Sequence, residues 1–420
     1  MGTMVAAKLA SEGGSRAVAL PAPVWPVVEE ADAALVADVI RSGVWSWVGP
    51  REREFCQAYA EFIGTRFCLG LANGTVTLQC ALQAVGVVPG DEVIVPALTW
   101  VATAQAAMDI GANVVFADID PVTLALDPAA FEAAITPRTR AVIPVHLYGC
   151  MCDMDAILDI ARRHGLKVVE DVAHQHGSRW RGKGAGSLGD AGSFSFQQSK
   201  VLTSGEGGAV TCDDPEVYRT IFALKQVGWT PDNPLVDAFG PLVRGNKYGH
   251  NYRITEMQAA LLLCGLKRLP EQTARREANA LRIAATLTAA GGPLQVAPRD
   301  PRITTQAYYA LTLTFDPVKA GIPRARYLAA LAAEGCTMGG TYEPVYRNPL
   351  LNLADATSPL PFRQNLSQDY ANLRLPNTER AFGETAVTLS QKYLLGSDEY
   401  TGQLLAAIRK VDDSLDRLRA

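Results

Sequence analysis

The sequence predicts an α/β protein with a mostly parallel sheet and a second, smaller domain. Short apolar stretches alternate with helical stretches through much of the chain, an order that places helices on both faces of a parallel sheet. The length of 420 residues exceeds the size at which a single hydrophobic core usually stops growing, so two domains are expected. Ligands of such sheets gather beyond the carboxyl ends of the strands, so side chains there are the first candidates for a site.

The elements of the larger domain follow one another regularly. A helix over Glu29–Arg41 ends at Ser42-Gly43, as is typical of a helix C-terminus, and a second helix covers Glu52–Ile63. Seven strands are expected, at Leu69–Ala72, Glu92–Pro96, Asn113–Ala117, Ala141–Val145, Leu166–Glu170, Ser193–Phe196 and Ala209–Cys212. Helices between them are expected from Gly74 to about Val85, over Thr103–Asp109 and over Asp153–His164.

The C-terminal part is expected to form the smaller domain. A helix from about Glu271 to Ala290 bridges to it, and a strand at Ala307–Phe315, a helix at Arg324–Glu334 and a final helix at Asp398–Leu418 follow. The predicted division is an Ala/Gly/Pro-rich arm at 1–25, a large domain at 26–270 and a small domain at 271–420. Tyr342–Tyr346 and the Pro-rich stretch 348–376 are expected to be loops that close over a site.

Composition argues against several classes of partner. The balance of 39 Lys and Arg against 43 Asp and Glu, without a basic run, makes nucleic acid an unexpected partner. No apolar run approaches the roughly 18 residues of a membrane span, and Met1–Leu20 lacks the apolar core of a secretory signal, so a cytoplasmic protein is expected. The eight cysteines are mostly scattered singly and are expected to be reduced and structural.

One lysine occupies an unusual place for a charged side chain. Lys200 lies in a polar turn between two buried strands, just before a bend at Gly205, Gly207 and Gly208. Burying an ammonium is costly unless it is paired, deprotonated or used covalently. The ordinary interpretation is a solvated lysine on a surface turn. The alternative is a lysine that forms a Schiff base with a carbonyl cofactor, which also needs a phosphate cradle and an acid facing the pyridine nitrogen.

Candidates for both requirements are present. Asn73-Gly74-Thr75 leads from a strand into a helix, where backbone N–H groups and the helix dipole favour an anion, although the same residues form an ordinary turn and N-cap. Asp171 follows a buried strand and could keep a pyridine nitrogen protonated. An alternative for this stretch is a metal site of Asp171, His174 and His176, but no further His or Cys cluster supplies a remaining ligand, and no metal is expected.

Two glycine-rich motifs are not interpreted as nucleotide sites. Gly184–Gly189 matches G-x-G-x-x-G but neither follows a buried strand nor opens a helix. Gly205-Glu206-Gly207-Gly208 lacks the Lys-Ser/Thr ending of a P-loop, so a bend is expected there.

Together these motifs resemble the DegT/DnrJ/StrS family of pyridoxal-phosphate-dependent aminotransferases, from about Val44 to the C-terminus. The resemblance implies a fold-type-I, aspartate aminotransferase-like architecture with a seven-stranded sheet in the large domain and an α+β small domain. It implies pyridoxal 5′-phosphate as cofactor, bound as an internal aldimine by Lys200 and faced by Asp171. It further implies that Trp100 stacks on the ring, that Gly74, Thr75 and Ser195 bind the phosphate, and that Asn251 reaches the phosphate in the neighbouring subunit of a homodimer with shared active sites.

His174 departs from the commonest pattern of that family, which has Gln three residues after the aspartate. His there is similar to the branch that aminates keto-cyclitols such as scyllo-inosose. Its side chain could stack on the cofactor or bond its 3-oxygen.

The resemblance implies transfer of an amino group from L-glutamate or L-glutamine to a sugar or cyclitol ketone in the synthesis of aminoglycoside-type secondary metabolites. One alternative is a nucleotide-linked (dTDP) ketosugar as acceptor, with Arg179, Arg181, Lys183, Arg244 and Lys247 as cations for its diphosphate. Another is a catalytically silent regulatory or sensor protein of the same fold, against which the presence of Lys200 and Asp171 argues.

Overall fold

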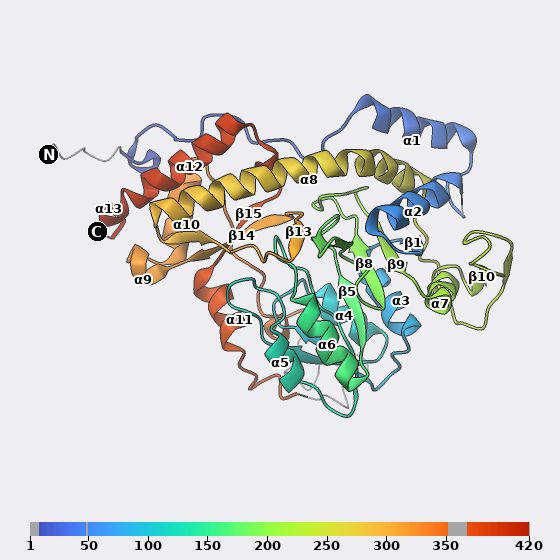
Figure 1. The fold of residues 1–420 in the computed structure, drawn as a ribbon. Helices are drawn as coiled ribbons and strands as arrows, with labels where there is room; N and C mark the ends of the chain where they lie inside the picture. The colour runs from blue at the N-terminus through green and yellow to red at the C-terminus, as the bar shows by residue number, and fades with distance from the viewer. Residues whose placement is uncertain (1–7, 48, 352–367, 420) are drawn as a thin grey trace.

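A seven-stranded, mostly parallel sheet forms the centre of the protein in a computed structural model that describes residues 8–47, 49–351 and 368–419 (Figure 1). The strand order is β1-β9-β8-β5-β4-β2-β3, and β9 is antiparallel to both of its neighbours. The strands are β1 (Phe67–Leu71), β2 (Glu92–Pro96), β3 (Asn113–Ala117), β4 (Thr139–Val142), β5 (Lys167–Asp171), β8 (Ala191–Ser195) and β9 (Gly208–Cys212). The predicted fold class and all seven strands are thereby confirmed.

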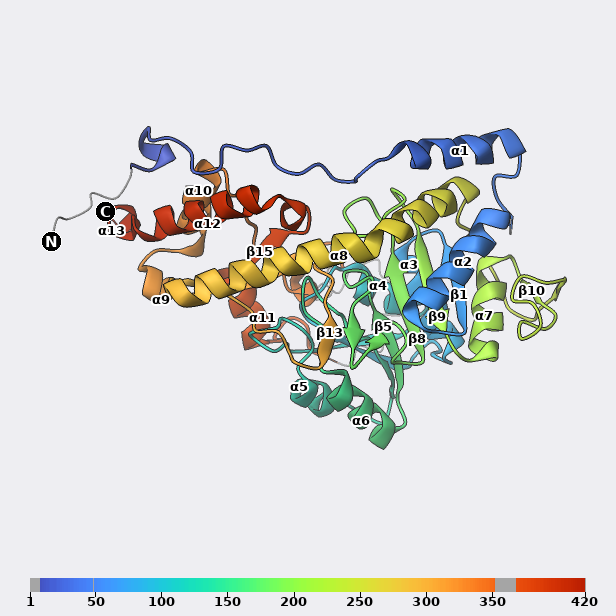
Figure 2. The same cartoon turned by 45° about the horizontal axis from the view of Figure 1, so that its top comes forward.

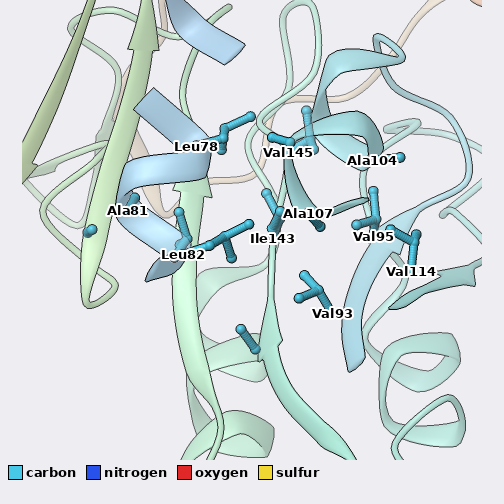
Figure 3. Close-up of a cluster of buried hydrophobic side chains, with 14 of the residues drawn as sticks. Leu78, Ala81, Leu82, Val93, Val95, Ala104, Ala107, Val114, Ile143 and Val145 are labelled. Atoms are coloured by element: carbon cyan, nitrogen blue, oxygen red, sulfur yellow. The ribbon is translucent and has the colours of Figure 1, made fainter. Parts of the chain in front are cut away.

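Helices cover both faces of this sheet, because its strands are apolar on both sides. Along β2, Val93 and Val95 pack with α3 (Gly74–Ala84), α4 (Ala102–Asp109) and α7 (Pro215–Lys225). Figure 3 shows this cluster around Leu82. Ile94, between the two valines, faces the opposite cluster with α2 (Pro50–Ile63), α5 (Pro128–Ala133) and α6 (Met154–His164). This alternation follows from the two-residue period of a strand.

The longest helix, α8 (Glu256–Ala290), connects the region of α1 and α2 to the region of the C-terminal elements (Figure 1). Thr255 caps its N-terminus together with Gln258, and Pro270 lies inside it. The helix expected to begin at about Glu271 is therefore the second half of a longer one. A proline in a helix interior usually costs about 3 kcal/mol, but the buried side chains of Leu269 and Thr273 on either side of it hold both halves in one helix.

The C-terminal part forms a further apolar cluster, the C-terminal cluster, around the sheet β12 (Leu294–Val296), β14 (Ala310–Phe315) and β15 (Ala386–Ser390). Helices α10 (Arg324–Ala333) and α12 (Asp398–Asp412) pack on it. The expected final helix is divided, because α12 ends at Asp412 and a separate α13 (Leu415–Arg419) follows. The remaining α-helices and strands are α1 (Glu30–Ser42), β6 (Arg179–Trp180), β7 (Lys183–Gly184), β10 (Trp229–Pro231), β11 (Leu242–Arg244), β13 (Ile303–Thr305), α9 (Pro317–Ala320) and α11 (Pro376–Arg380).

The N-terminal segment lies along the C-terminal cluster and continues to α1 (Figure 2). Leu9 and Val18 are buried in the cluster, and the buried Glu334 carboxylate accepts the backbone N–H groups of Ala10 and Ala17. Farther along, the indole Nε1 of Trp25 donates to the carbonyl of Gln198, at 3.1 Å. The segment thus connects the C-terminal cluster to the turn before Lys200.

Residues 345–351 and 370–386 pack back against the α3, α4 and α7 face of the seven-stranded sheet, so the large sheet and the C-terminal cluster do not divide strictly at one residue. The domain limits 26–270 and 271–420 stay a prediction. All eight cysteines are buried and free. None of the helices within the described ranges is both long and apolar enough to cross a bilayer.

Candidate active site

A cavity of about 750 Å³ opens beyond the carboxyl ends of β5 and β8. Its walls come from the N-terminal ends of α3 and α4, the ends of these strands, the turn after β8, and two tyrosines from the C-terminal part, Tyr309 and Tyr342. Of the predicted site residues, it brings together Gly74, Thr75, Trp100, Asp171, His174, Ser195 and Lys200. Asn251 does not line it.

Lys200 is nearly buried, with 9% of its surface exposed, and its ammonium makes no hydrogen bond or ion pair with the described residues. Its Nζ lies 4.5 Å from the centroid of the Tyr309 ring. Burial lowers the lysine pKa to about 8, against a smaller opposing effect of the Asp171 charge. A lysine on a surface turn would be neither buried nor shifted to a lower pKa, so the interpretation of Lys200 as a solvated side chain is wrong.

The turn that carries Lys200 is closed by its own backbone. Phe196 N–H donates to Gly207 O, and Gln198 N–H donates to Gly205 O. Gly205 and Gly207 adopt φ of +84° and +147°, a region that side-chain-bearing residues rarely enter. These glycines make the bend, and the bend returns the chain into β9 with Lys200 facing the cavity.

Asp171 ends β5 and is held in place by two donors. Its Oδ2 accepts from the Thr103 hydroxyl at 2.9 Å, and its Oδ1 accepts from Ala173 N–H at 3.2 Å. Burial raises the pKa of the carboxyl, while the Ala173 and Thr103 hydrogen bonds and the Lys200 charge lower it. A cation placed beside this carboxylate would therefore be strongly favoured.

The N-terminus of α3 forms the third part of the site. Asn73 Oδ1 caps the helix by accepting Val76 N–H at 3.0 Å, so the ordinary N-cap predicted for this turn is present. The first N–H groups of a helix have no partner within it. A Cβ at Gly74 would lie 2.7 Å from the Ser195 Cβ, so only glycine lets β8 approach the helix this closely. The hydroxyl-bearing residues Thr75 and Ser195 line the cavity beside these N–H groups.

His174 lies among aromatic rings. It stacks on Tyr309 with centroids 3.8 Å apart, and on the other side on Tyr148 at 5.6 Å. Its Nδ1 accepts Tyr148 N–H at 3.2 Å, which fixes the proton of the neutral ring on Nε2. Burial, with the Lys200 charge, holds the His174 pKa well below its usual value, so the ring is neutral.

His176 is directed away from the cavity and shares a hydrogen bond of 2.9 Å with the Tyr59 hydroxyl. The alternative metal site of Asp171, His174 and His176 is therefore not assembled. Across residues 8–47, 49–351 and 368–419, no group of three His, Cys, Asp or Glu side chains could hold a metal ion.

The G-x-G-x-x-G segment has a structural partner that the sequence did not reveal. The buried Glu170 carboxylate accepts the N–H groups of Gly186, Leu188 and Gly189 at 2.7–2.9 Å, and it also pairs with His146 Nε2 at 3.1 Å. The glycine-rich loop thus holds an internal carboxylate. Because His146 N–H donates to Asp171 O, this network also fixes the end of β5.

Sequence reasoning missed Tyr309 and Tyr148 as site residues, and it noted Tyr342 only as part of a loop that closes over a site. Tyr309 N–H donates to Tyr148 O, and the Tyr148 hydroxyl accepts Tyr342 N–H. These contacts join positions more than 150 residues apart, so no local sequence pattern predicts them.

Asn251 lies at the surface, with its Oδ1 accepting Arg253 N–H at 3.4 Å. Large apolar side chains of the surrounding segments are also half or more exposed: Trp45, Trp47, Val227 and Tyr248. Exposed apolar side chains gathered in this way are typical of a surface that a partner covers.

The comparison with known proteins agrees with this geometry. The DegT/DnrJ/EryC1/StrS aminotransferase family matches residues 26–386. An L-glutamine:scyllo-inosose aminotransferase of Streptomyces griseus is 39% identical, with 97% of this chain and 98% of the relative covered. An L-glutamine:2-deoxy-scyllo-inosose aminotransferase of Streptomyces lividus is also 39% identical, again covering 97% and 98%.

Solved structures of similar proteins share the whole fold. 3-Amino-5-hydroxybenzoic acid synthase superposes with a TM-score of 0.81 at 31% identity, covering 94% of this chain and 99% of that one. The structure of DesI in the presence of its TDP-sugar product superposes with a TM-score of 0.79 at 30% identity, covering 98% of this chain and 97% of that one.

Proposed function

The chain belongs to the DegT/DnrJ/EryC1/StrS aminotransferase family, and from this premise we propose that it moves an amino group from L-glutamine or L-glutamate to the ketone of a cyclitol, with pyridoxal 5′-phosphate as cofactor. The observation that carries the proposal is the buried, unpartnered Lys200 in one cavity with Asp171 and a helix N-terminus. The comparisons support amination of a cyclitol, because the curated relatives are named for scyllo-inosose and its deoxy derivatives.

The residues of the cavity fit this cofactor. Its phosphate would meet the N–H groups of Gly74 and Thr75 and the hydroxyls of Thr75 and Ser195. Trp100 and His174 would lie against its ring, and Lys200 would bind its aldehyde. The cofactor supplies an aldehyde that captures amines and a ring that accepts the electrons released when the donor Cα–H bond breaks.

The side chains of this protein would supply the proton chemistry. Because its pKa is lowered to about 8, Lys200 loses its proton far more easily than an exposed lysine, and its neutral amine can take up a proton from the donor Cα and release it again. Asp171, oriented by Thr103, would keep the ring nitrogen protonated. His174, neutral and protonated at Nε2, can donate to an oxygen but cannot act as a cation.

The cavity favours a neutral acceptor over a nucleotide-linked sugar. None of the five cations considered for a diphosphate lines it. Arg179 donates to Phe62 O, Arg181 pairs with Asp155, and Arg244 lies over the Trp229 ring. Among the described residues, a diphosphate would therefore find no arginine in the cavity, whereas the hydroxyls of a cyclitol would meet Tyr and Thr side chains.

We further infer a homodimer in which Asn251 reaches the cofactor phosphate of the partner subunit. The exposed apolar side chains around it support a covered surface at this position.

The proposal is tested by incubating the purified, cofactor-loaded protein with glutamine or glutamate and either scyllo-inosose or a dTDP-ketosugar, and by following amine formation by mass spectrometry. We expect the visible absorbance of a bound cofactor and amination of the cyclitol. Lys200→Ala should lose both. A colourless protein, or turnover by the Lys200→Ala variant, would overturn the assignment. Amination of the dTDP-ketosugar alone would show that the acceptor is a nucleotide-linked sugar and not a free cyclitol.

A further inference from the structure

The turn that carries Lys200 is held from outside by two side chains that lie far from it in sequence. The indole Nε1 of Trp25 donates to Gln198 O at 3.1 Å, and the Tyr309 hydroxyl shares a hydrogen bond of 3.0 Å with the Ser199 hydroxyl. Among the described residues, these are the only hydrogen bonds that reach Gln198 and Ser199 from outside the turn. The two residues before the lysine are therefore placed by Trp25 and Tyr309.

Both of these side chains are connected to one arginine of α8, Arg276. Its guanidinium carbon lies 5.1 Å from the centroid of the Trp25 ring. Its Nε and Nη2 donate to Gln391 Oε1 at 3.0 and 2.7 Å, and Gln391 N–H donates to Tyr309 O at 3.0 Å. A continuous chain of contacts therefore leads from Arg276 to both sides of the Lys200 turn.

Arg276 is an unusual residue for this position. Its side chain is fully buried, no carboxylate pairs with it among the described residues, and its Nη1 has no hydrogen-bond partner there. Burying a charge without a counter-ion is unfavourable, so the stability of the fold does not by itself account for an arginine here. A planar guanidinium can contact an aromatic ring and bind an oxygen with two N–H groups at once, which an ammonium cannot. Arg276 makes both contacts, to Trp25 and to Gln391.

These contacts bear on Lys200 because they fix both its place and its shielding from water. The Lys200 Nζ lies 4.5 Å from the centroid of the same Tyr309 ring whose hydroxyl bonds to Ser199. Burial lowers the pKa of Lys200 to about 8. A turn released from Trp25 or Tyr309 would let water reach the ammonium, and a hydrated ammonium holds its proton more strongly.

We propose that Arg276 is a positioning residue for Lys200 and that it acts through Trp25 and through Gln391 and Tyr309, which hold the lysine turn from two sides. This inference rests on the proposed function for the task that Lys200 performs. It adds to that function a residue that does not line the cavity. The arrangement depends on the shape of the guanidinium and not on its charge alone, because an ammonium could not make both connections.

The test uses two variants and a matched control. Arg276→Lys keeps the positive charge but loses the planar group, and Trp25→Phe keeps a ring but loses the Nε1 donor. Trp180→Phe is the control, because the Trp180 indole also donates a hydrogen bond, to Asp155 at 2.9 Å, and lies 4.5 Å from the guanidinium carbon of Arg302, yet does not line the cavity. All comparisons are made at a temperature at which circular dichroism shows each variant to be folded.

The first measurement follows the reaction of Lys200 with trace acetic anhydride against pH in the cofactor-free protein, by peptide mass spectrometry. The wild type and the control should titrate with a Lys200 pKa of about 8. Arg276→Lys and Trp25→Phe should titrate higher by about 0.5 to 1 pH unit, because the lysine becomes hydrated. The change cannot come from an altered titratable group of the cavity, since both variants retain all that line it with Lys200: Asp171, His174, Glu206, Tyr309 and Tyr342.

The second measurement is the rate of the absorbance change when glutamine alone is added to the loaded enzyme. A misplaced lysine should lower the maximal rate about 10-fold in Arg276→Lys, with the glutamine concentration for half-maximal rate within about 3-fold of wild type. A merely structural role would lower the resistance to urea and leave both readouts unchanged.

Wild-type behaviour of either folded variant in both measurements, or equal changes in Trp180→Phe, would overturn the inference. If Arg276→Lys fails to fold, Trp25→Phe decides, because the Trp25 side chain is only partly buried. Failure of the loaded wild type to respond to glutamine would instead count against the proposed function, and the pH profile of the cofactor-free protein would still decide whether Arg276 positions Lys200.

Discussion

Replacing Lys200 by methionine should stabilise the cofactor-free protein, and the gain should shrink as the pH rises. The lysine pKa is lowered from 10.5 to about 8 in the folded state, so folding opposes the charged form. Below about pH 8, the folded protein bears the full free-energy cost of burying the Lys200 ammonium. This cost disappears as the pH rises past the lysine pKa of the unfolded chain. At about 1.4 kcal/mol per pKa unit, the shift corresponds to about 3 kcal/mol at pH 7 and about 1 kcal/mol at pH 10.

The assay is urea unfolding of cofactor-free wild type and Lys200→Met at pH 7 and pH 10, at one protein concentration, because subunit association would contribute to stability. The difference in unfolding free energy between variant and wild type should be about 2 kcal/mol more favourable at pH 7 than at pH 10. Lys183→Met serves as the exposed control. A difference that is equal at both pH values would refute the claim that burial disfavours the Lys200 ammonium.

Three further predictions concern other parts of the structure. Burial raises the Asp412 pKa to about 6, so the wild type should lose stability as the pH rises from about 4 to 7. The Asp412→Asn variant keeps an acceptor for the Tyr327 hydroxyl and should not show this loss, so its unfolding free energy at pH 7 should be about 2 kcal/mol higher in thermal or urea unfolding. Glu170→Gln should weaken cofactor affinity at least tenfold in a fluorescence titration, because one amide oxygen cannot replace a carboxylate that binds three N–H groups and His146. Unchanged affinity would show that the Glu170 network does not position Asp171. If sites are shared, mixing inactive Lys200→Ala with impaired Asn251→Ala subunits should restore activity in mixed dimers, whereas the absence of restoration would place Asn251 outside the partner's site.

The sequence predicted the sheet well because its strands are apolar on both faces. Glu92–Pro96 and Asn113–Ala117 coincide with β2 and β3, while β4 ends three residues before the expected Val145. Local patterns also indicated Lys200 and Asp171, since charged side chains directly after buried strands are unusual. The helix expected from about Glu271 to Ala290 is the second half of α8 (Glu256–Ala290), which continues through Pro270 because tertiary packing overrides the usual effect of a proline inside a helix.

The rest of the site depends on contacts between distant parts of the chain. Tyr309 reaches the cavity from β14's leading segment, and nothing near it in sequence distinguishes it from a core tyrosine. The G-x-G-x-x-G loop illustrates the same limit: its sequence context argued against a dinucleotide site, but only the fold placed Glu170 beneath its N–H groups. Residues 352–367 of the predicted Pro-rich loop lie outside the described part of the structure.

The hydrogen bond between Trp25 and Gln198 connects the N-terminal segment to the turn that carries Lys200. The segment from Ala10 to Trp25 is anchored at Glu334 on one side and at the lysine turn on the other. A motion that moved the Glu334 region away from the lysine turn would have to break one of these contacts. Removing the residues before Pro26 would delete both anchors, including the one on the turn that carries Lys200.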